Sequence, residues 1–253
     1  DLELRRGWIR FSGMRGFGDG WAAGLSIPWY RNKITGQIGG FPASGVADGF
    51  GNVTLIGRKV LWEDCKRGAK LKAALGLDLP VGADDQSFGP DNIVTNGYFN
   101  SGRRIPLGWQ PSSGTFNGLG SLAYGQSRDR FAWQALVAGK VYGMNDEDVK
   151  IGNVFLAAIN STYGITRDLA GSLGFTLRSQ SDDEYPNSPL PVNGPELRGT
   201  TSHSAIVYVD AALRYNIKDV VTIGIGVRAP IMHPDDGMDP LEEFSIIFYP
   251  SVN

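Results

Sequence analysis

Charged residues in this 253-residue sequence recur at alternate positions along several segments. Lys70, Lys72 and Asp78 share one parity within a single segment, and Asp210 and Arg214 share one parity within another. Successive side chains of a β-strand point to opposite faces, so this spacing gathers the charges on one face of each strand. Rows of such charges can attract and guide ions and polar solutes, so this spacing indicates electrostatic binding of solutes.

One segment holds residue types suited to nucleophilic catalysis. In Ser202-His203-Ser204 the imidazole could act as a base and a hydroxyl as a nucleophile, as in a lipid hydrolase at the rim of a barrel. Catalysis also needs a group that orients the histidine and a donor for the oxyanion, and no pattern in the sequence supplies them. A polar strand start is the simpler interpretation, and we expect no catalytic residue.

Metal and cofactor sites are not indicated either. His233 precedes an acidic stretch, Pro234 to Asp239, whose residue order differs from that of a calcium-binding loop. The acidic runs at 146–148 and 182–184 could hold divalent cations against lipid phosphates, although such runs are usually solvated. Cys65 is the single cysteine, which excludes a disulfide framework and a multi-cysteine metal centre. We expect no cofactor and no bound metal.

The composition excludes two further classes of protein. A formal net charge of −2 and a pI near 5.7 exclude a broadly basic nucleic-acid-binding protein, so no nucleic-acid partner is expected. No run approaches 18 consecutive apolar residues, and the mean hydropathy is −0.16, so no transmembrane helix is expected. Transmembrane strands need only about 9 to 11 residues with one apolar face, a signal that average hydropathy does not show.

Alternation of apolar and polar residues runs through most of the chain. A helical period would place Lys72 or Arg214 among apolar neighbours, so no helix is predicted. We predict eleven strands, at about residues 2–12, 20–31, 52–62, 70–80, 113–127, 130–143, 149–165, 169–180, 204–215, 221–228 and 242–249. Short polar turns alternate with long segments between these strands; the long ones lie at about 32–51, 81–112, 181–202 and 231–241.

This organisation is typical of a bacterial outer-membrane barrel, with short periplasmic turns and long extracellular loops. One face of the strands is uniformly apolar, and aromatic residues near the strand ends suit the two membrane interfaces. A soluble all-β domain also alternates, but several of these stretches are about twice as long as the common strand of about 5 to 6 residues. We therefore predict an all-β fold in which residues 1–253 form a single antiparallel up-and-down transmembrane β-barrel.

Three motifs resemble those of a known family: GDGWAAGLSIPWYRNK at 18–33, GFGNVTLIGRKVLW at 49–62 and GLDLPVGADD at 76–85. They are similar to the outer-membrane protein family of the MetA pathway of phenol degradation, with its G-L-S-L-P-x-G-type strand end and G-x-G-D-type strand start. Asn52 stands where the second motif usually has an acidic residue. The resemblance covers most of the chain and implies a barrel of about 12 strands that passes small aromatic or other hydrophobic compounds, without catalytic residues.

The predicted count of eleven strands is odd, whereas single-chain bacterial barrels usually have an even number with both termini in the periplasm. We expect a twelfth strand, either N-terminal to Asp1 or within residues 93–112. The end of the chain, residues 248–253, also departs from the terminal aromatic residue typical of such barrels.

We interpret the chain as a channel in the bacterial outer membrane for the passive passage of small molecules, namely aromatic or hydrophobic compounds or organic anions. The alternatives are a plugged structural or partner-binding barrel and an outer-membrane lipid hydrolase. The expected partners are outer-membrane lipid, lipopolysaccharide and a small-molecule solute; no oligomeric state is predicted.

The lumen is predicted to be positive, because the inward positions hold more basic than acidic residues. With Arg178, Arg214 and Arg228 as the constriction, weak anion selectivity is expected. The predicted lumen-lining residues are Lys70, Lys72, Asp78, Lys140, Arg178, Asp210, Arg214 and Arg228, and the further inward cations are Arg6, Arg10 and Lys150.

Overall fold

The computed structural model describes residues 2–38, 41–85, 110–145, 150–182, 184, 204–217, 221–232, 245–248 and 251–252. Several predicted features lie outside these residues: His203, His233, the acidic run at 146–148 and most of the segment 93–112. No helix of membrane-spanning length and hydrophobicity occurs in the described part of the chain.

The described residues form one sheet of thirteen antiparallel strands. Eleven of them follow one another along a single path and correspond to the eleven predicted strands, while β3 pairs only with β2 and β13 only with β11. The strands are β1 (Leu2–Gly18), β2 (Trp21–Ile38), β3 (Phe41–Phe50), β4 (Val53–Asp64), β5 (Ala69–Leu79), β6 (Asn117–Arg128), β7 (Phe131–Tyr142), β8 (Val154–Gly164), β9 (Leu169–Gln180), β10 (Ser204–Ile217), β11 (Val221–Met232), β12 (Ser245–Phe248) and β13 (Ser251–Val252).

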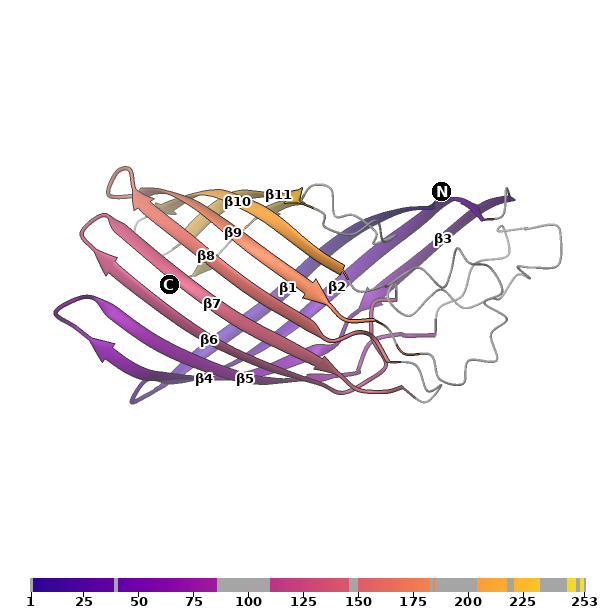
Figure 1. Cartoon of the computed structure of the whole chain (residues 1–253), viewed down its shortest axis with the longest axis horizontal. Helices are drawn as coiled ribbons and strands as arrows, with labels where there is room; N and C mark the ends of the chain where they lie inside the picture. The colour runs from indigo at the N-terminus through magenta and orange to yellow at the C-terminus, as the bar shows by residue number, and fades with distance from the viewer. Residues whose placement is uncertain are drawn as a thin grey trace.

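The sheet curls on itself into a barrel. In Figure 1, β4 to β9 form the wall nearer the viewer, while β1 and β2 cross behind them with the opposite tilt. Each strand on the path pairs with the strands beside it in that order, so the connections are those of an up-and-down meander. The predicted all-β, antiparallel barrel fold is confirmed.

The segment 32–51 was predicted as a long loop, and the structure shows that this is wrong. The strand β2 continues to Ile38, and its second half pairs with β3, while its first half pairs with β4 along the same edge. At the junction, the amide of Gly51 donates to the carbonyl of Pro28 at 2.8 Å. Glycines and Pro42 lower the strand propensity of this segment, but pairing along the whole length of β2 outweighs that preference.

Because β3 and β4 share one edge of β2, β3 does not supply the expected twelfth wall strand, which stays a prediction. Together, β1, β2 and β3 extend beyond the wall at the end of the barrel that carries the long connections (Figure 1).

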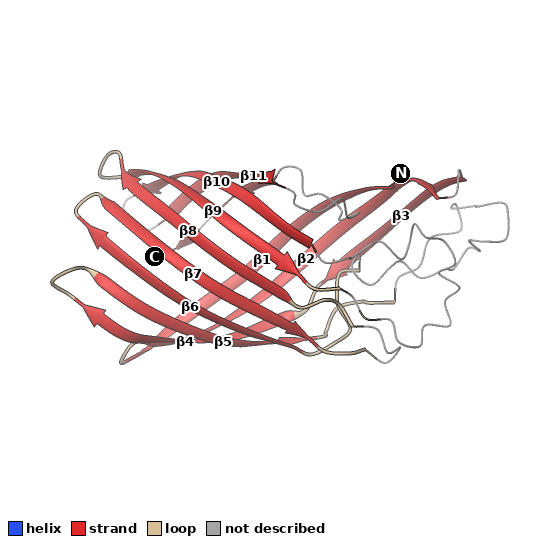
Figure 2. Cartoon of the chain, in the orientation of Figure 1, coloured by secondary structure: helices blue, strands red, loops and turns tan. Residues whose placement is uncertain are grey.

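The short connections gather at the opposite end of the barrel (Figure 2). In the turn between β4 and β5, Asp64 Oδ1 accepts hydrogen bonds from the amides of Lys66 and Arg67, at 2.9 and 3.1 Å. Gly68 closes this turn with a φ of 61°, and a Cβ there would lie 2.1 Å from the carbonyl oxygen of Ser127. The turn chemistry therefore fixes where β4 ends and β5 begins.

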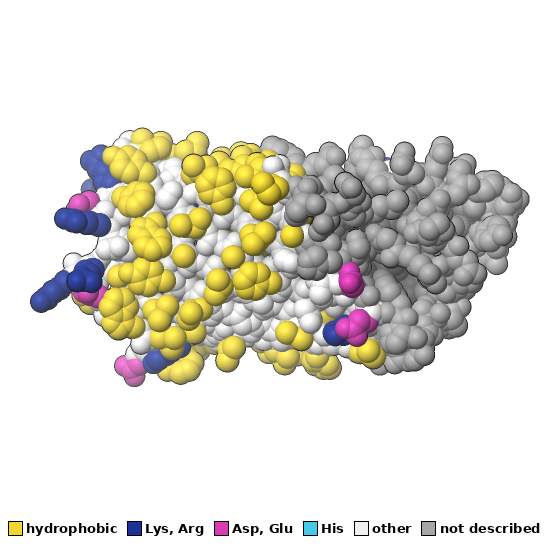
Figure 3. Space-filling view, in the orientation of Figure 1, with side chains coloured by type: hydrophobic (Ala, Val, Ile, Leu, Met, Phe, Trp, Pro, Cys, Tyr) yellow, Lys and Arg dark blue, Asp and Glu magenta, His cyan; other side chains and the backbone are white. Residues whose placement is uncertain are grey.

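Large apolar side chains cover the outer surface of the barrel. Exposed and buried residues alternate from Leu173 to Leu177 in β9 and from Ile223 to Val227 in β11, and the exposed ones are the large apolar residues. Leu75 in β5 is 75% exposed. Hydrophobic side chains accordingly spread over the visible wall in Figure 3. Such a surface suits lipid contact, since contiguous exposed apolar area of this extent is rare on soluble proteins.

Aromatic side chains mark the short-turn end of the outer surface. Trp62 stacks with Tyr124 at a centroid distance of 6.5 Å, and Tyr124 lies 5.4 Å from Trp133. Exposed aromatic residues also lie at or within two residues of this end of their strands, namely Trp21, Phe131, Tyr163 and Tyr215. Aromatic residues are enriched at membrane interfaces, so this belt marks one boundary of the lipid-facing surface.

The arrangement of long and short connections predicts which end faces the cell exterior. Asp182 is exposed beside the long-connection end of β9, and Cys65 is exposed in a short turn. On intact cells, a membrane-impermeant maleimide should label Asp182→Cys in a Cys65→Ser background, while native Cys65 should react only after the outer membrane is opened. Equal labelling of Cys65 on intact cells would contradict this orientation.

The alternation in β8 predicts unequal costs of charge at neighbouring positions. Ile159 is exposed on the outer face, whereas Ala158 lines the interior. Ile159→Arg should lower the free energy of unfolding from lipid by about 2 to 4 kcal/mol, because an arginine near the bilayer midplane faces lipid. Ala158→Arg is the matched control and should lower the free energy of unfolding much less. Equal losses in reversible unfolding from lipid vesicles would show that the two faces are misassigned.

Candidate functional site

The inner face of the barrel encloses a cavity of about 680 Å³. Residues of seven consecutive strands, β5 to β11, line it, and many carry amide or hydroxyl groups, for example Gln134, Asn160 and Thr162. Its volume lies within the range of about 300 to 1,000 Å³ that is common for small-molecule sites. The charged residues of its lining are Lys70, Lys72, Asp210, Arg214 and Arg228.

One carboxylate of this cavity is already neutralised. Asp210 Oδ1 lies 2.6 Å from Arg228 Nε, and Thr176 Oγ1 donates to Asp210 Oδ2 at 2.6 Å. The strand register explains this cluster, because Asp210 in β10 lies directly opposite Arg228 in β11. The Arg228 guanidinium also lies over the ring of Tyr208, 5.4 Å from its centroid. Arg228 therefore adds little net charge to the cavity.

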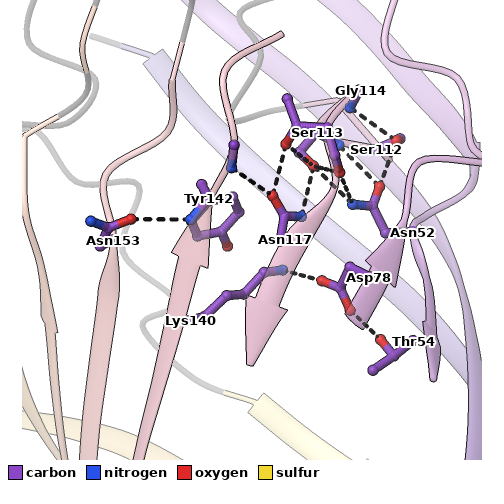
Figure 4. Close-up of polar contacts among 12 residues, drawn as sticks. Asn52, Thr54, Asp78, Ser112, Ser113, Gly114, Asn117, Lys140, Tyr142 and Asn153 are labelled. Atoms are coloured by element: carbon purple, nitrogen blue, oxygen red, sulfur yellow. Dashed lines mark hydrogen bonds and ion pairs between the residues drawn. The ribbon is translucent and has the colours of Figure 1, made fainter. Parts of the chain in front are cut away.

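A second cluster, in which a lysine takes the place of the arginine, lies nearer the long-connection end (Figure 4). Thr54 Oγ1 donates to Asp78 Oδ1 at 2.6 Å, and Lys140 Nζ lies 2.6 Å from Asp78 Oδ2. The Lys140 ammonium also lies 4.5 Å from the centroid of the Tyr142 ring. Asp78 is 3% exposed, so its charge requires this pairing. Each predicted acidic residue thus lies within 2.6 Å of a predicted basic residue.

Lys70 also has an acidic partner, Glu63, which was not among the residues predicted to face the lumen. Its Nζ lies 2.8 Å from Glu63 Oε1. Between Val60 and Trp62 the register of β4 shifts, and this irregularity places Glu63 opposite Lys70. A bulge changes the parity of every residue that follows it, and the sequence carries no clear signal for it.

Lys72 and Arg214 differ from the other charged residues of the cavity. Within the part of the chain that the structure describes, neither side chain has an ion pair or a hydrogen bond to a carboxylate. Their neighbours in the strand register are small or apolar: Val60 and Ala123 for Lys72, and Ala170 and Gly224 for Arg214. Glu63 interacts electrostatically with Lys72 but forms its ion pair with Lys70, so Lys72 is offset only in part, while Arg214 contributes its full positive charge to the cavity.

Arg178, Arg214 and Arg228 lie on adjoining strands but at different levels. Along β10, Arg178 lies opposite Ile206 and Arg228 lies opposite Asp210, and Arg214 follows four residues further on. Arg178 also donates a hydrogen bond from Nη2 to Gln180. The three arginines therefore form successive steps along the wall, and their role as a constriction stays a prediction.

The further inward cations are distributed along the barrel. Arg10 lies over the Trp8 ring at 5.2 Å, opposite Pro28 in β2. Lys150 lies 2.6 Å from Glu184. The side chain of Arg6 lies outside the described residues. Neither Arg10 nor Lys150 lines the cavity.

A buried polar cluster lies at the long-connection end of the lumen, in the segment that precedes β6 (Figure 4). Asn52 Nδ2 donates to Ser113 Oγ at 2.8 Å and to the Thr115 carbonyl at 3.3 Å. Asn52 Oδ1 accepts from Ser112 Oγ at 2.6 Å and from the Ser113 amide at 3.2 Å. Asn117 completes this mouth cluster, since its Nδ2 donates to Ser113 Oγ at 3.0 Å.

The mouth cluster corrects the predicted start of a strand. We predicted a strand from residue 113, but β6 begins at Asn117, and residues 112–115 are nearly all buried among polar partners. The cluster also explains why position 52 holds an asparagine and not the acidic residue of the family motif. An aspartate could not donate the two hydrogen bonds that Asn52 Nδ2 makes to Ser113 Oγ and the Thr115 carbonyl. Buried polar contacts therefore hold the segment before β6 against Asn52, which directly precedes β4.

The described residues offer little for metal or thiol chemistry. They contain no group of three or more His, Cys, Asp or Glu side chains that could hold a metal ion. Cys65 is exposed and unbridged in its turn.

A curled antiparallel sheet with an apolar outer surface, an aromatic belt and a charged, polar interior defines an outer-membrane β-barrel. Residues 8–230 match the model of the family described as "Putative MetA-pathway of phenol degradation", so the chain belongs to that family. The resemblance found in the sequence is thereby confirmed. Among curated proteins, none matches the chain by sequence.

Comparison with solved structures also found similar proteins. The chain is similar to the COG4313 outer membrane channel from Pseudomonas putida F1, with a TM-score of 0.68 and 9% sequence identity, over 100% of this chain and 85% of that one. A second structure is OmpT, an outer membrane protein of Vibrio cholerae, with a TM-score of 0.41 and 7% identity, over 98% and 97% of the two chains. At this identity, the first likeness shows the barrel fold.

The mouth cluster predicts that Asn52 is sensitive to loss of its amide donors. Asn52→Asp keeps the size of the side chain but places an oxygen against the Thr115 carbonyl, and should lower the free energy of unfolding by about 1 to 3 kcal/mol. Asn153→Asp is the matched control, because Asn153 Oδ1 accepts a hydrogen bond from the Tyr142 amide and a carboxylate can still do so. Equal stability of Asn52→Asp and the unchanged protein in reversible unfolding would contradict this role.

Proposed function

We propose that this protein is an outer-membrane channel through which small organic anions pass passively. The observation that carries the proposal is the charge of the cavity lining. Among the described residues, four cations and one carboxylate line the cavity, although the chain as a whole has a formal charge of −2. An excess of positive charge inside a narrow, low-dielectric wall favours anions, because the field is focused there.

The ion pairs identify the residues that supply this charge. Asp210 pairs with Arg228, and Glu63 pairs with Lys70 and partly offsets Lys72, so Arg214 and in part Lys72 supply the positive charge of the lining. Small residues such as Ala212 and Gly226 line the same cavity and leave room beside these cations. Both features, the positive charge and the open space, favour the passage of an organic anion.

The proposal assigns the chain a transport role and no catalytic residue. A barrel with a plugged lumen is the second candidate, and the mouth cluster favours it, because its polar side chains are buried and bind one another at the long-connection end. Conduction by single molecules in a planar bilayer separates the two, since a plugged barrel would not conduct.

The proposed charge of the lumen predicts the ion selectivity. Under a KCl gradient, the reversal potential should show a preference for chloride over potassium. Arg214→Glu should lower the chloride-to-potassium permeability ratio by about two- to tenfold, because it replaces an uncompensated cation of the lining. Arg167→Glu changes an exposed turn residue outside the lining and is the matched control.

Two results would contradict the proposal. A preference for potassium in the unchanged protein would show that the lining does not determine selectivity. The same permeability ratio in Arg214→Glu and Arg167→Glu would show that Arg214 does not face the permeating ion.

A further inference from the structure

Lys72 and Arg214 occupy comparable positions on well-separated strands of the barrel. Lys72 lies three residues from the first residue of β5, Ala69, and Arg214 lies three residues from the last residue of β10, Ile217. Both of these strand ends adjoin short connections, which gather at one end of the barrel (Figure 2). Lys72 and Arg214 are therefore at similar heights above that end.

The strand order places the two cations on different sides of the lumen. Four strands, β6 to β9, separate β5 from β10 along the sheet, which curls on itself. Both side chains line the same cavity of about 680 Å³. The space between them is bordered by small and polar side chains, including Gln134, Asn160 and Thr162.

From this arrangement we infer that the cavity is a binding site for small dicarboxylates, with one carboxylate held by Lys72 and the other by Arg214. The inference rests on the proposed function, because it assigns a solute class to the same lumen. A monocarboxylate can pair with one of the two cations at a time and leaves the other without an ion pair. A dicarboxylate of suitable length satisfies both, and each charged contact adds affinity.

The amides and hydroxyls of the cavity support the same ligand class. Asn160 in β8 reaches over Gly174 in β9, where a Cβ would lie 1.8 Å from Asn160 Oδ1, so the absence of a side chain at this position accommodates the amide. Gln134 lies directly opposite Asn160 in the register of β7 and β8. These two amides lie on the wall between the two cations and can donate hydrogen bonds to carboxylate oxygens.

The test compares acids that share a carbon skeleton. Adipate with hexanoate and terephthalate with 4-methylbenzoate are added to single channels in a planar bilayer, and the concentration that halves the chloride current is measured for each. We expect each dicarboxylate to block at a concentration about tenfold or more below that of its monocarboxylate, as a second charged contact should add that much affinity.

Variants test whether Lys72 and Arg214 cause the difference in blocking concentration between paired acids. Lys72→Gln and Arg214→Gln should each remove most of the difference between paired acids, whereas Lys72→Arg and Arg214→Lys should retain it. Arg167→Gln, in an exposed turn outside the lining, should behave as the unchanged protein. Heat-modifiable migration on an unboiled gel checks that each variant forms a barrel.

Two outcomes would overturn the inference. Equal block by paired acids in a channel that still prefers chloride would refute the dicarboxylate site and leave the anion channel standing. A tenfold difference that persists in both glutamine variants would place the second contact elsewhere. A preference for potassium would instead refute the proposed function itself.

Discussion

Backbone hydrogen bonding in a lipid environment is the constraint on which this structure depends. Every N–H and C=O group within the hydrocarbon region needs a partner inside the protein, and a curled sheet of consecutive antiparallel strands provides them. A strand of such a sheet has one face toward lipid and one toward the lumen, so its side chains must alternate between two chemistries. The exposed Leu173, Phe175 and Leu177 of β9 and the buried Gly174 and Thr176 between them follow directly from this requirement.

The same constraint made most of the fold predictable from the sequence. Period-two alternation located the eleven strands of the main path, because the apolar face tolerates almost no charge where it meets lipid. It also placed Asp78, Lys140, Asp210 and Arg228 on a common face, since parity alone decides the side of a strand on which a residue lies. Boundaries were less accurate, as the start of β6 shows, because polar residues before a strand continue its pattern without joining the sheet.

Contacts between distant segments could not be predicted in this way. The irregularity after Val60 places Glu63 beside Lys70, and only the pairing of β4 with β5 reveals it. The ion pairs of Asp78 and Asp210 likewise depend on strand register, which alternation does not specify. These contacts change the expected charge of the lumen. A count of inward charges treats paired and unpaired cations alike, although a cation that is paired with a carboxylate adds little net charge. Among the described residues, Lys72 and Arg214 are the cations of the cavity without an ion pair, and Glu63 partly offsets Lys72.

The alternation of lipid-facing and lumen-facing residues is the claim that most needs a direct measurement. Spin labels placed one at a time along residues 171–178 of β9, in a Cys65→Ser background in lipid vesicles, report collisions with oxygen from the bilayer and with a water-soluble nickel complex. We expect oxygen collisions to peak at positions 173, 175 and 177 and nickel collisions to peak at 172, 174 and 176, out of phase with each other. Two profiles that rise and fall together, or that show no period of two, would contradict a barrel with a lipid-facing surface and a wet lumen.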